Sequence, residues 1–193
     1  MAETKFKFKK CELIPNEGSS LDEKYELLGG GPIVDYYESI DSPTISMNIT
    51  FIDIDQVISR KGISGGEHID LTIEIDGFDD FKLTKKKHNL MLNSVRNVIT
   101  ETNKQVATLE FVSVESIINE TARVNKKFTG NVSQTVSELL VSYKKGIQTK
   151  KKLDKHNSAN SYSFVGNLKR PFDTVQWLCP KTQSSSKNCL LYT

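Results

Sequence analysis

The side chains in this sequence that most often carry catalysis are sparse and far apart. The three histidines are His68, His88 and His156. None of them stands at metal-ligand spacing from a cysteine or a carboxylate, and lone histidines of this kind are mostly surface or hydrogen-bonded residues. The sequence has no HExxH, CxxC or GxSxG pattern, which would mark a zinc, redox or serine-nucleophile site. We therefore expect a non-enzymatic protein with no catalytic residues and no metal ligands.

Two acidic pairs and one glycine-rich segment are the remaining candidates for a reactive site. Asp53 with Asp55, and Asp79 with Asp80, could act as paired carboxylates. Acidic pairs at strand ends are far more often solvated turn residues, which is the interpretation we adopt. Residues 29–31 are three glycines, but neither the Walker pattern nor GxGxxG follows, and the next run is strand-like. These glycines are predicted to connect strands, and no cofactor is expected.

Two lysine-rich segments could contact an anionic partner. They are residues 85–88 and the stretch from Lys144 to Lys155. Proteins that bind single-stranded nucleic acid interleave such cations with aromatic side chains, and neither segment has an aromatic platform. The 26 basic and 24 acidic residues leave a formal charge of +2, so the chain lacks the concentrated basic surface that phosphate binding needs. Solvated surfaces are the preferred interpretation of both segments.

Length, cysteine count and apolar runs limit the class of protein. The 193 residues suffice for one large domain or two small ones. Cys11, Cys179 and Cys189 are odd in number and widely spread, which favours folding in a reducing cytosol. No apolar run approaches the roughly 20 residues that span a bilayer, and MAETKFKFKK lacks the continuous apolar region of a signal peptide. We expect no membrane partner.

The elements that would position any site are strands in the first part of the chain. Apolar and polar residues alternate with period two over residues 5–9, 45–51, 69–75 and 106–111, with a shorter candidate at 81–83. Glycine, proline and asparagine turn signals separate these runs. Several short alternating strands at such spacing favour a small antiparallel barrel or sandwich, so residues 1–111 are predicted to be all-β.

After Phe111 the apolar residues follow helical spacing. Ser113 can cap one helix, and Asn131 can cap a second that continues to Tyr143. A polar, lysine-rich loop is expected over residues 148–160, followed by a candidate strand at 162–168. Pro171 suits the first position of a short helix, whose apolar residues are Phe172, Val175, Trp177 and Leu178 and which Pro180 would end. The second region, residues 112–186, is therefore predicted to be mixed.

Three segments together carry a resemblance, and the second and third of them are too specific to be generic periodic patterns. They are CELIPNEG (residues 11–18), YYESIDSP (residues 36–43) and RPFDTVQWLCPK (residues 170–181). In type, order and separation they resemble the baseplate hub family of contractile-tailed bacteriophages, especially the hubs of phages of marine cyanobacteria. The resemblance covers about residues 10 to 186, and the segments between these three fit the family only in strand and helix type.

The resemblance implies a fold, a function and partners. The fold is mainly β with some α, an α+β chain of two tandem antiparallel β-barrel tube domains, the second truncated and carrying inserted helices. The family forms a homotrimeric ring that joins the tail tube to the tail spike and lines the DNA ejection channel. Expected partners are further copies, the spike, the tube and other baseplate proteins, and DNA only as it passes. The expected location is the virion, after assembly in the host cytoplasm.

The chain departs from the family in length. Hub proteins are roughly twice as long, and the tail at residues 187–193 has no matching continuation. A truncated, split or frameshifted hub is the expectation from this pattern. Such a product should trimerise poorly by itself, expose unpaired strand edges and be rescued by the C-terminal part. The alternative functions are a small nucleic-acid-binding β-barrel and, with much less support, an enzyme.

Overall fold

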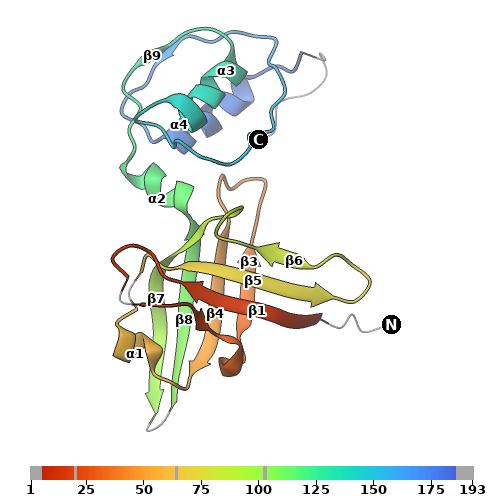
Figure 1. The fold of residues 1–193 in the computed structure, drawn as a ribbon. Helices are drawn as coiled ribbons and strands as arrows, with labels where there is room; N and C mark the ends of the chain where they lie inside the picture. The colour runs from red at the N-terminus through yellow and green to blue at the C-terminus, as the bar shows by residue number, and fades with distance from the viewer. Residues whose placement is uncertain (1–5, 20, 64, 102–103, 186–193) are drawn as a thin grey trace. The chain divides into compact units, whose positions relative to one another are not determined.

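The computed structural model describes residues 6–19, 21–63, 65–101 and 104–185. The chain divides into two compact units (Figure 1), of which the first comprises residues 1–38 and 44–114 and the second residues 39–43 and 115–193. The division thus falls between Val114 and Glu115, and the short segment 39–43 belongs to the second unit. Lys5, Cys189 and the expected non-matching tail at 187–193 lie outside the described residues.

The first unit is built on one antiparallel sheet with the strand order β2-β1-β5-β7-β8-β4-β3, and β6 pairs with β5. The strands are β1 (Phe6–Ile14), β2 (Tyr25–Glu26), β3 (Ile33–Tyr37), β4 (Ser46–Asp53), β5 (His68–Ile75), β6 (Phe81–Leu83), β7 (Leu90–Glu101) and β8 (Lys104–Ser113). A short 3-10 turn, η1 (Leu28–Gly30), connects β2 to β3, and α1 (Val57–Lys61) follows β4. The three glycines at 29–31 therefore connect strands, as predicted.

The alternating patterns in β4, β5 and β8 are confirmed. In the middle of each strand every second residue is apolar and faces the core, as the period of two requires. The residues between them face outward and are polar except for Ile52 on β4 and Val106 and Val112 on β8. The central buried residues of these strands are Met47, Ile49, Phe51, Ile69, Leu71, Ala107, Leu109 and Phe111. Together with the buried residues of the other strands, they form the hydrophobic core of the first unit.

Partway along strand β1, the set of residues that face the core changes from even-numbered to odd-numbered positions. The ladder with β5 slips between Phe8 and Lys10, which is a β-bulge. Before the bulge the even-numbered Phe8 packs against the core, and after it the odd-numbered Cys11 and Leu13 are buried. Burial raises the pKa of the Cys11 thiol to about 12, with a further contribution from Glu26. The alternation at residues 5–9 was therefore only the first part of a longer strand.

Strand β7 was not predicted from the sequence, although it is the longest in the sheet. Two irregularities interrupt its ladder with β8, one between Leu92 and Ser94 and one between Arg96 and Ile99. Each irregularity changes which residues face the core, so no simple alternation survives along the strand. The helix α1 was missed as well, because its single turn is too short for a helical pattern to emerge.

The ends of the sheet curl toward each other without pairing. The Tyr36 ring on β3 and the Phe81 ring on β6 meet edge to face, with centroids 5.3 Å apart. The η1 turn lies directly against β4, where a side chain at Gly30 would overlap the Ile52 carbonyl group. No strand pairing among the described residues joins the two ends of the sheet. The antiparallel β class is confirmed, but the described strands do not form the closed barrel that was expected.

The second unit is a small mixed domain. Its elements are α2 (Val114–Thr121, which begins at the end of the first unit), β9 (Lys127–Phe128), α3 (Val132–Ser137), the π-helical turn η2 (Glu138–Ser142), β10 (Phe164–Val165), α4 (Pro171–Leu178) and the 3-10 turn η3 (Cys179–Lys181). Its only sheet among the described residues is the pair β10-β9, which is far from the second barrel that was expected. No described helix is both long and apolar enough to cross a membrane.

The helix signals in the second unit are largely confirmed. The Asn131 side chain accepts a hydrogen bond from the Ser133 N–H at 3.0 Å, so Asn131 caps α3 as predicted. Pro171 occupies the first turn of α4. Along α4, Phe172, Val175 and Leu178 are buried and Trp177 is half-buried. Of the predicted strand at 162–168, only the short strand β10 is realised, and Leu168 has a left-handed backbone conformation.

Candidate functional site

The sheet of the first unit leaves one edge open at β3. This strand pairs only with β4, from Ile33 opposite Thr50 to Tyr37 opposite Ser46. On the outer face of β3 the side chains of Ile33, Asp35 and Tyr37 are exposed. An exposed edge strand presents unpaired backbone groups to which another chain can add. The β3 edge is therefore a candidate assembly surface.

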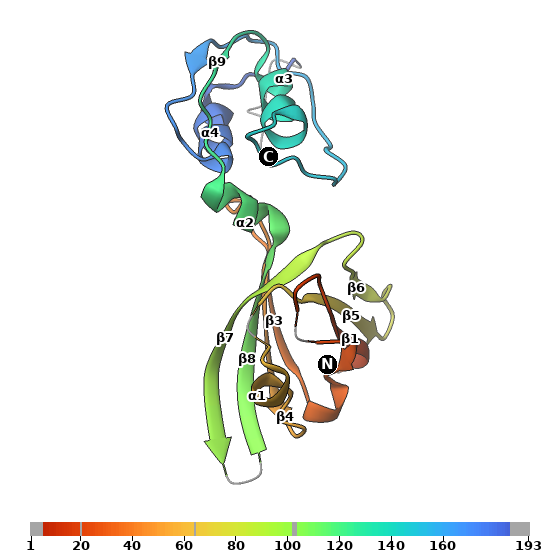
Figure 2. The same cartoon turned by 60° about the vertical axis from the view of Figure 1, so that its left-hand side comes forward.

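A second open edge runs along β7. This strand pairs with β5 only at Met91, opposite His68, whereas its other side continues along β8 to Glu101. From Asn93 onward, no described strand pairs with the free side of β7, which forms a long hairpin with β8 (Figure 2). The two open edges belong to different strands of the same sheet. Contact between one edge and the other edge of a second copy would be head-to-tail, which is the geometry of rings.

The outer face of the sheet carries an apolar row beside these edges. Ile52 on β4, Val106 on β8 and Ile99 on β7 are consecutive cross-strand neighbours. Ile52 is 39% exposed and Ile99 is 61% exposed, and Ile33 on β3 is 64% exposed. Single exposed apolar residues are ordinary, but a row of them in register on one face is typical of a contact surface.

The neighbouring polar residues on this face bind one another. Thr50 and Thr108 share a hydrogen bond of 2.9 Å. Glu110 accepts a hydrogen bond of 2.6 Å from Ser94 and pairs with Arg96 at 2.7 Å. Because these groups are satisfied within the sheet, the apolar row is the part of the face that gains most from being covered.

The two carboxyl groups of the acidic pair at the end of β4, Asp53 and Asp55, have different structural roles. Asp53 is fully buried, and its carboxyl oxygens accept hydrogen bonds from the N–H groups of Val57 and Ile58 at 2.8 and 2.9 Å. The prediction that Asp53 is a solvated turn residue is wrong, because it holds the first turn of α1. Asp55 accepts a hydrogen bond of 3.1 Å from the Tyr25 hydroxyl. Partial burial and, next, this bond raise the pKa of Tyr25 to about 12.

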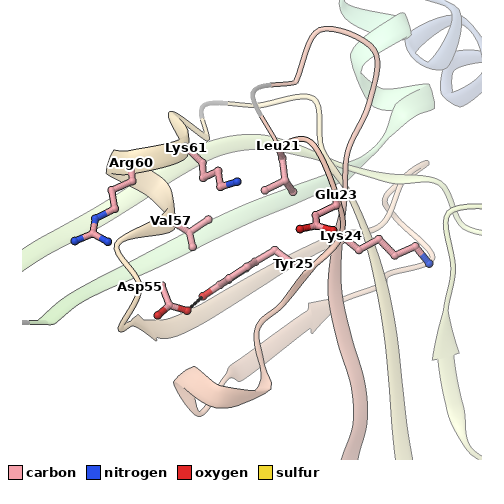
Figure 3. A pocket seen from close by; sticks show the side chains of 8 residues that line it. All are labelled: Leu21, Glu23, Lys24, Tyr25, Asp55, Val57, Arg60 and Lys61. Atoms are coloured by element: carbon pink, nitrogen blue, oxygen red, sulfur yellow. Dashed lines mark hydrogen bonds between the residues drawn. The ribbon is translucent and has the colours of Figure 1, made fainter.

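A hollow of about 300 Å³ lies beside the Tyr25–Asp55 pair (Figure 3). Besides this pair, its charged lining consists of the carboxylate of Glu23 and the cations of Lys24, Arg60 and Lys61. Charges of both signs therefore face the hollow, which favours neither anions nor cations. The arrangement resembles an ordinary solvated surface rather than a selective ligand site.

Two of the three histidines and one member of the second acidic pair have structural contacts. The His68 ring is buried, with Nδ1 3.2 Å from the Leu90 carbonyl oxygen, and burial lowers the pKa of His68. His88 Nδ1 accepts a hydrogen bond from the Thr84 N–H at 3.2 Å. Asp80 forms surface ion pairs with Lys82 and Lys9. No three metal-ligating side chains lie together in the part of the chain that the structure describes.

The second unit contains an aromatic cluster that the sequence did not reveal. Its rings are Phe128, Tyr143, Tyr162, Phe164 and Trp177. They come from four separated segments, and only the fold brings them together. Three lysine ammonium groups lie over these rings: Lys126 over Phe128 and Tyr143, and Lys169 and Lys181 over Trp177. Neither lysine-rich segment contains aromatic residues, but the fold brings three other lysines next to this aromatic cluster.

Two of the segments that resemble the hub family meet in the second unit. Residues 39–43 come from the YYESIDSP segment, and α4 comes from the RPFDTVQWLCPK segment. The Gln176 side-chain amide on α4 donates a hydrogen bond of 3.4 Å to the Asp41 carbonyl oxygen. The sequence predicted the two segments separately and gave no sign that they would be neighbours.

Comparison with known proteins gives a likeness of fold. No family model matches the sequence, and no curated protein matches it. Among solved structures, the tail protein from Neisseria meningitidis MC58 superposes with a TM-score of 0.53 at 10% sequence identity. The match covers 89% of this chain and 44% of that one, so this chain spans less than half the length of the Neisseria protein. At this identity the likeness concerns the fold alone.

Proposed function

We propose that this chain is a structural protein of a phage tail baseplate. Within the baseplate it forms the central hub ring that joins the tail tube to the spike and lines the DNA ejection channel. The observation that carries the proposal is the fold likeness to a tail protein over 89% of the chain. The hub-like segments at residues 36–43 and 170–181 support it independently, because they point to the same class of protein from sequence alone.

The proposed ring is a homotrimer held by head-to-tail contacts. The open edge of β3 in one copy lies against the open edge of β7 in the next, and the apolar row of Ile52, Val106 and Ile99 is covered in the assembly. Three copies are proposed because the resemblance is to a trimeric family. In this proposal the curled sheet of the first unit and the mixed second unit correspond to the two tandem tube domains of the hub.

The proposed protein acts by association and performs no reaction. Its partners are the spike, the tail tube and other baseplate proteins, and it meets DNA only as the genome passes through the channel. Its place is the virion, after assembly in the host cytoplasm. The open edges and the exposed apolar row support this proposal, because both are surfaces suited to protein contact.

Chemical cross-linking between the two open edges tests the ring. The double variant Asp35→Cys and Asn93→Cys places one thiol on β3 and one on β7, where both native side chains are exposed. Cys179→Ser and Cys189→Ser remove two native thiols that could react with the cross-linker. Cys11 is kept because it is buried. A truncated hub is expected to trimerise poorly by itself, but a bismaleimide traps even a weak trimer. The covalent species should therefore stop at three chains on a denaturing gel.

The single-cysteine variants are the matched controls. A head-to-tail contact joins the β3 edge only to the β7 edge, so neither single variant should cross-link. Products that continue beyond three chains would mean an open filament, and the absence of products at micromolar concentration would mean that these edges do not meet. Tight binding of single-stranded DNA in a gel shift, without cross-links, would favour the nucleic-acid-binding barrel.

A further inference from the structure

The extended segment around β10 has one free side. It pairs with the β9 side through the N–H groups of Tyr162, Gly166 and Leu168, and Phe164 is in the same register opposite Phe128. In an antiparallel ladder alternate residues point their backbone groups to opposite sides. The N–H and carbonyl groups of residues 163, 165 and 167 therefore face away from β9. All three residues are exposed, and no described strand pairs with them.

A hollow of about 200 Å³ lies next to this free edge, lined by residues of the β10 segment and of α4. Its apolar wall is formed by Phe164, Val165 and Trp177. Val165 is 67% exposed, and Gly166 packs so closely against Val124 that a Cβ there would overlap it. The volume is below that of sites for drug-sized ligands and suits one apolar side chain.

The charge around this hollow is positive. Lys169 lines it, and both Lys169 and Lys181 place their ammonium groups over the Trp177 ring, 5.4 and 4.6 Å from its centre. Neither lysine has a carboxylate partner among the described residues, whereas the nearby Arg170 is paired with Glu120 and Asp173. Two cations without counter-ions beside one apolar hollow attract a group that is negative and partly apolar.

We propose that this edge binds an extended acidic segment of a partner protein. The segment adds as a strand to β10, places one apolar side chain in the hollow and sets carboxylates near Lys169 and Lys181. This mode combines backbone hydrogen bonds for affinity with a side-chain pocket and charge for selection. The inference rests on the second unit and goes beyond the proposed ring, which uses the sheet edges of the first unit.

The same features disfavour nucleic acid as the occupant. A nucleobase needs an open aromatic face for stacking. The Trp177 indole meets Tyr162 and Phe164 edge to face and has lysine ammonium groups over it, so little of its face is free. The outward N–H and carbonyl groups of this edge alternate as those of a peptide strand do, whereas a phosphate backbone offers only acceptors.

The fluorescence of Trp177 tests the proposal directly, because it is the only tryptophan in the chain. The full chain is titrated with a capped peptide of alternating valine and glutamate, and in parallel with one of alternating valine and lysine and with oligothymidylate. The acidic peptide should change the emission saturably, and the basic peptide should not. Saturable binding of oligothymidylate alone, or no response to the acidic peptide, would overturn the proposal.

Three variants separate the parts of the site. Lys169→Glu should lower the affinity for the acidic peptide roughly tenfold or more, because an attraction between charges becomes a repulsion. Lys150→Glu makes the same charge change at an exposed position that does not line the hollow, and should leave affinity unchanged. Val165→Pro removes one outward N–H without touching the β9 ladder and should also abolish binding. Equal affinity for Lys169→Glu and the original protein would refute the site, whatever happens to the proline variant.

Discussion

Replacing Asp53 with alanine should destabilise the first unit more than any other single change to a carboxyl group there. The fully buried side chain satisfies the N–H groups of Val57 and Ile58, which start α1. Without it both donors stay buried and unpaired, at about 1–3 kcal/mol each, so Asp53→Ala should cost about 2 to 6 kcal/mol. That is a large part of the about 5–15 kcal/mol that stabilises a typical protein.

Urea unfolding followed by far-ultraviolet circular dichroism is the suitable assay. Fluorescence would miss the effect, because the single tryptophan, Trp177, belongs to the second unit. The β-sheet signal comes mainly from the first unit, whose sheet holds all but two of the described strands. With a slope of about 1.5–2 kcal/mol per molar urea, the midpoint of this signal should fall by roughly 2 M.

Two control variants show whether the buried carboxyl group is the cause. Asp55→Ala removes only the exposed hydrogen bond to the Tyr25 hydroxyl and should cost less than about 1 kcal/mol. Asp53→Asn keeps the shape and one acceptor oxygen, so its midpoint should lie between those of the original protein and Asp53→Ala. An Asp53→Ala midpoint equal to that of Asp55→Ala would refute the assignment of Asp53 as the residue that holds α1.

Three further changes should have measurable effects. Trp177→Ala should lower the stability of the second unit by about 2 kcal/mol, which is less than the loss of a fully buried ring would cost. Thermal unfolding followed by near-ultraviolet circular dichroism would measure this loss. Burial lowers the pKa of His68, so folding disfavours its protonation, and stability should fall as the pH drops below about 6.5; His68→Gln should remove that part of the pH dependence. Gly166→Ala would overlap Val124 and should cost about 1–3 kcal/mol, whereas Gly29→Ala meets open space and should stay within about 0.5 kcal/mol in the same melting experiment.

The sequence predicted the elements whose pattern is regular over their whole length. The ladders that join β4 to β3 and to β8 have no register shift, so Met47, Ile49 and Phe51 keep their alternation. Helix α4 was predicted because Pro171 marks its start and its apolar residues need a surface. In such elements the local pattern and the final packing agree.

The features that were missed depend on contacts between distant residues. Strand β7 shifts its register against β8 twice, so its own alternation does not show which of its residues face the core. Asp53 looks like any turn residue until α1 folds over it. The lysines at Trp177 come from positions 169 and 181, outside both lysine-rich runs. Neither the open edges nor the aromatic cluster can be read from spacing, because both are properties of the assembled fold.

The place of residues 39–43 has a consequence for synthesis of the protein. Asp41 and Gln176, which share a hydrogen bond in the second unit, are 135 positions apart in the chain. On the ribosome the first unit can fold once β8 has emerged, but this segment must wait for α4, almost the last element to be made. Nascent chains therefore carry a loop whose docking site does not yet exist. Translation speed through the region before α4 should set how long that loop stays available to other nascent copies.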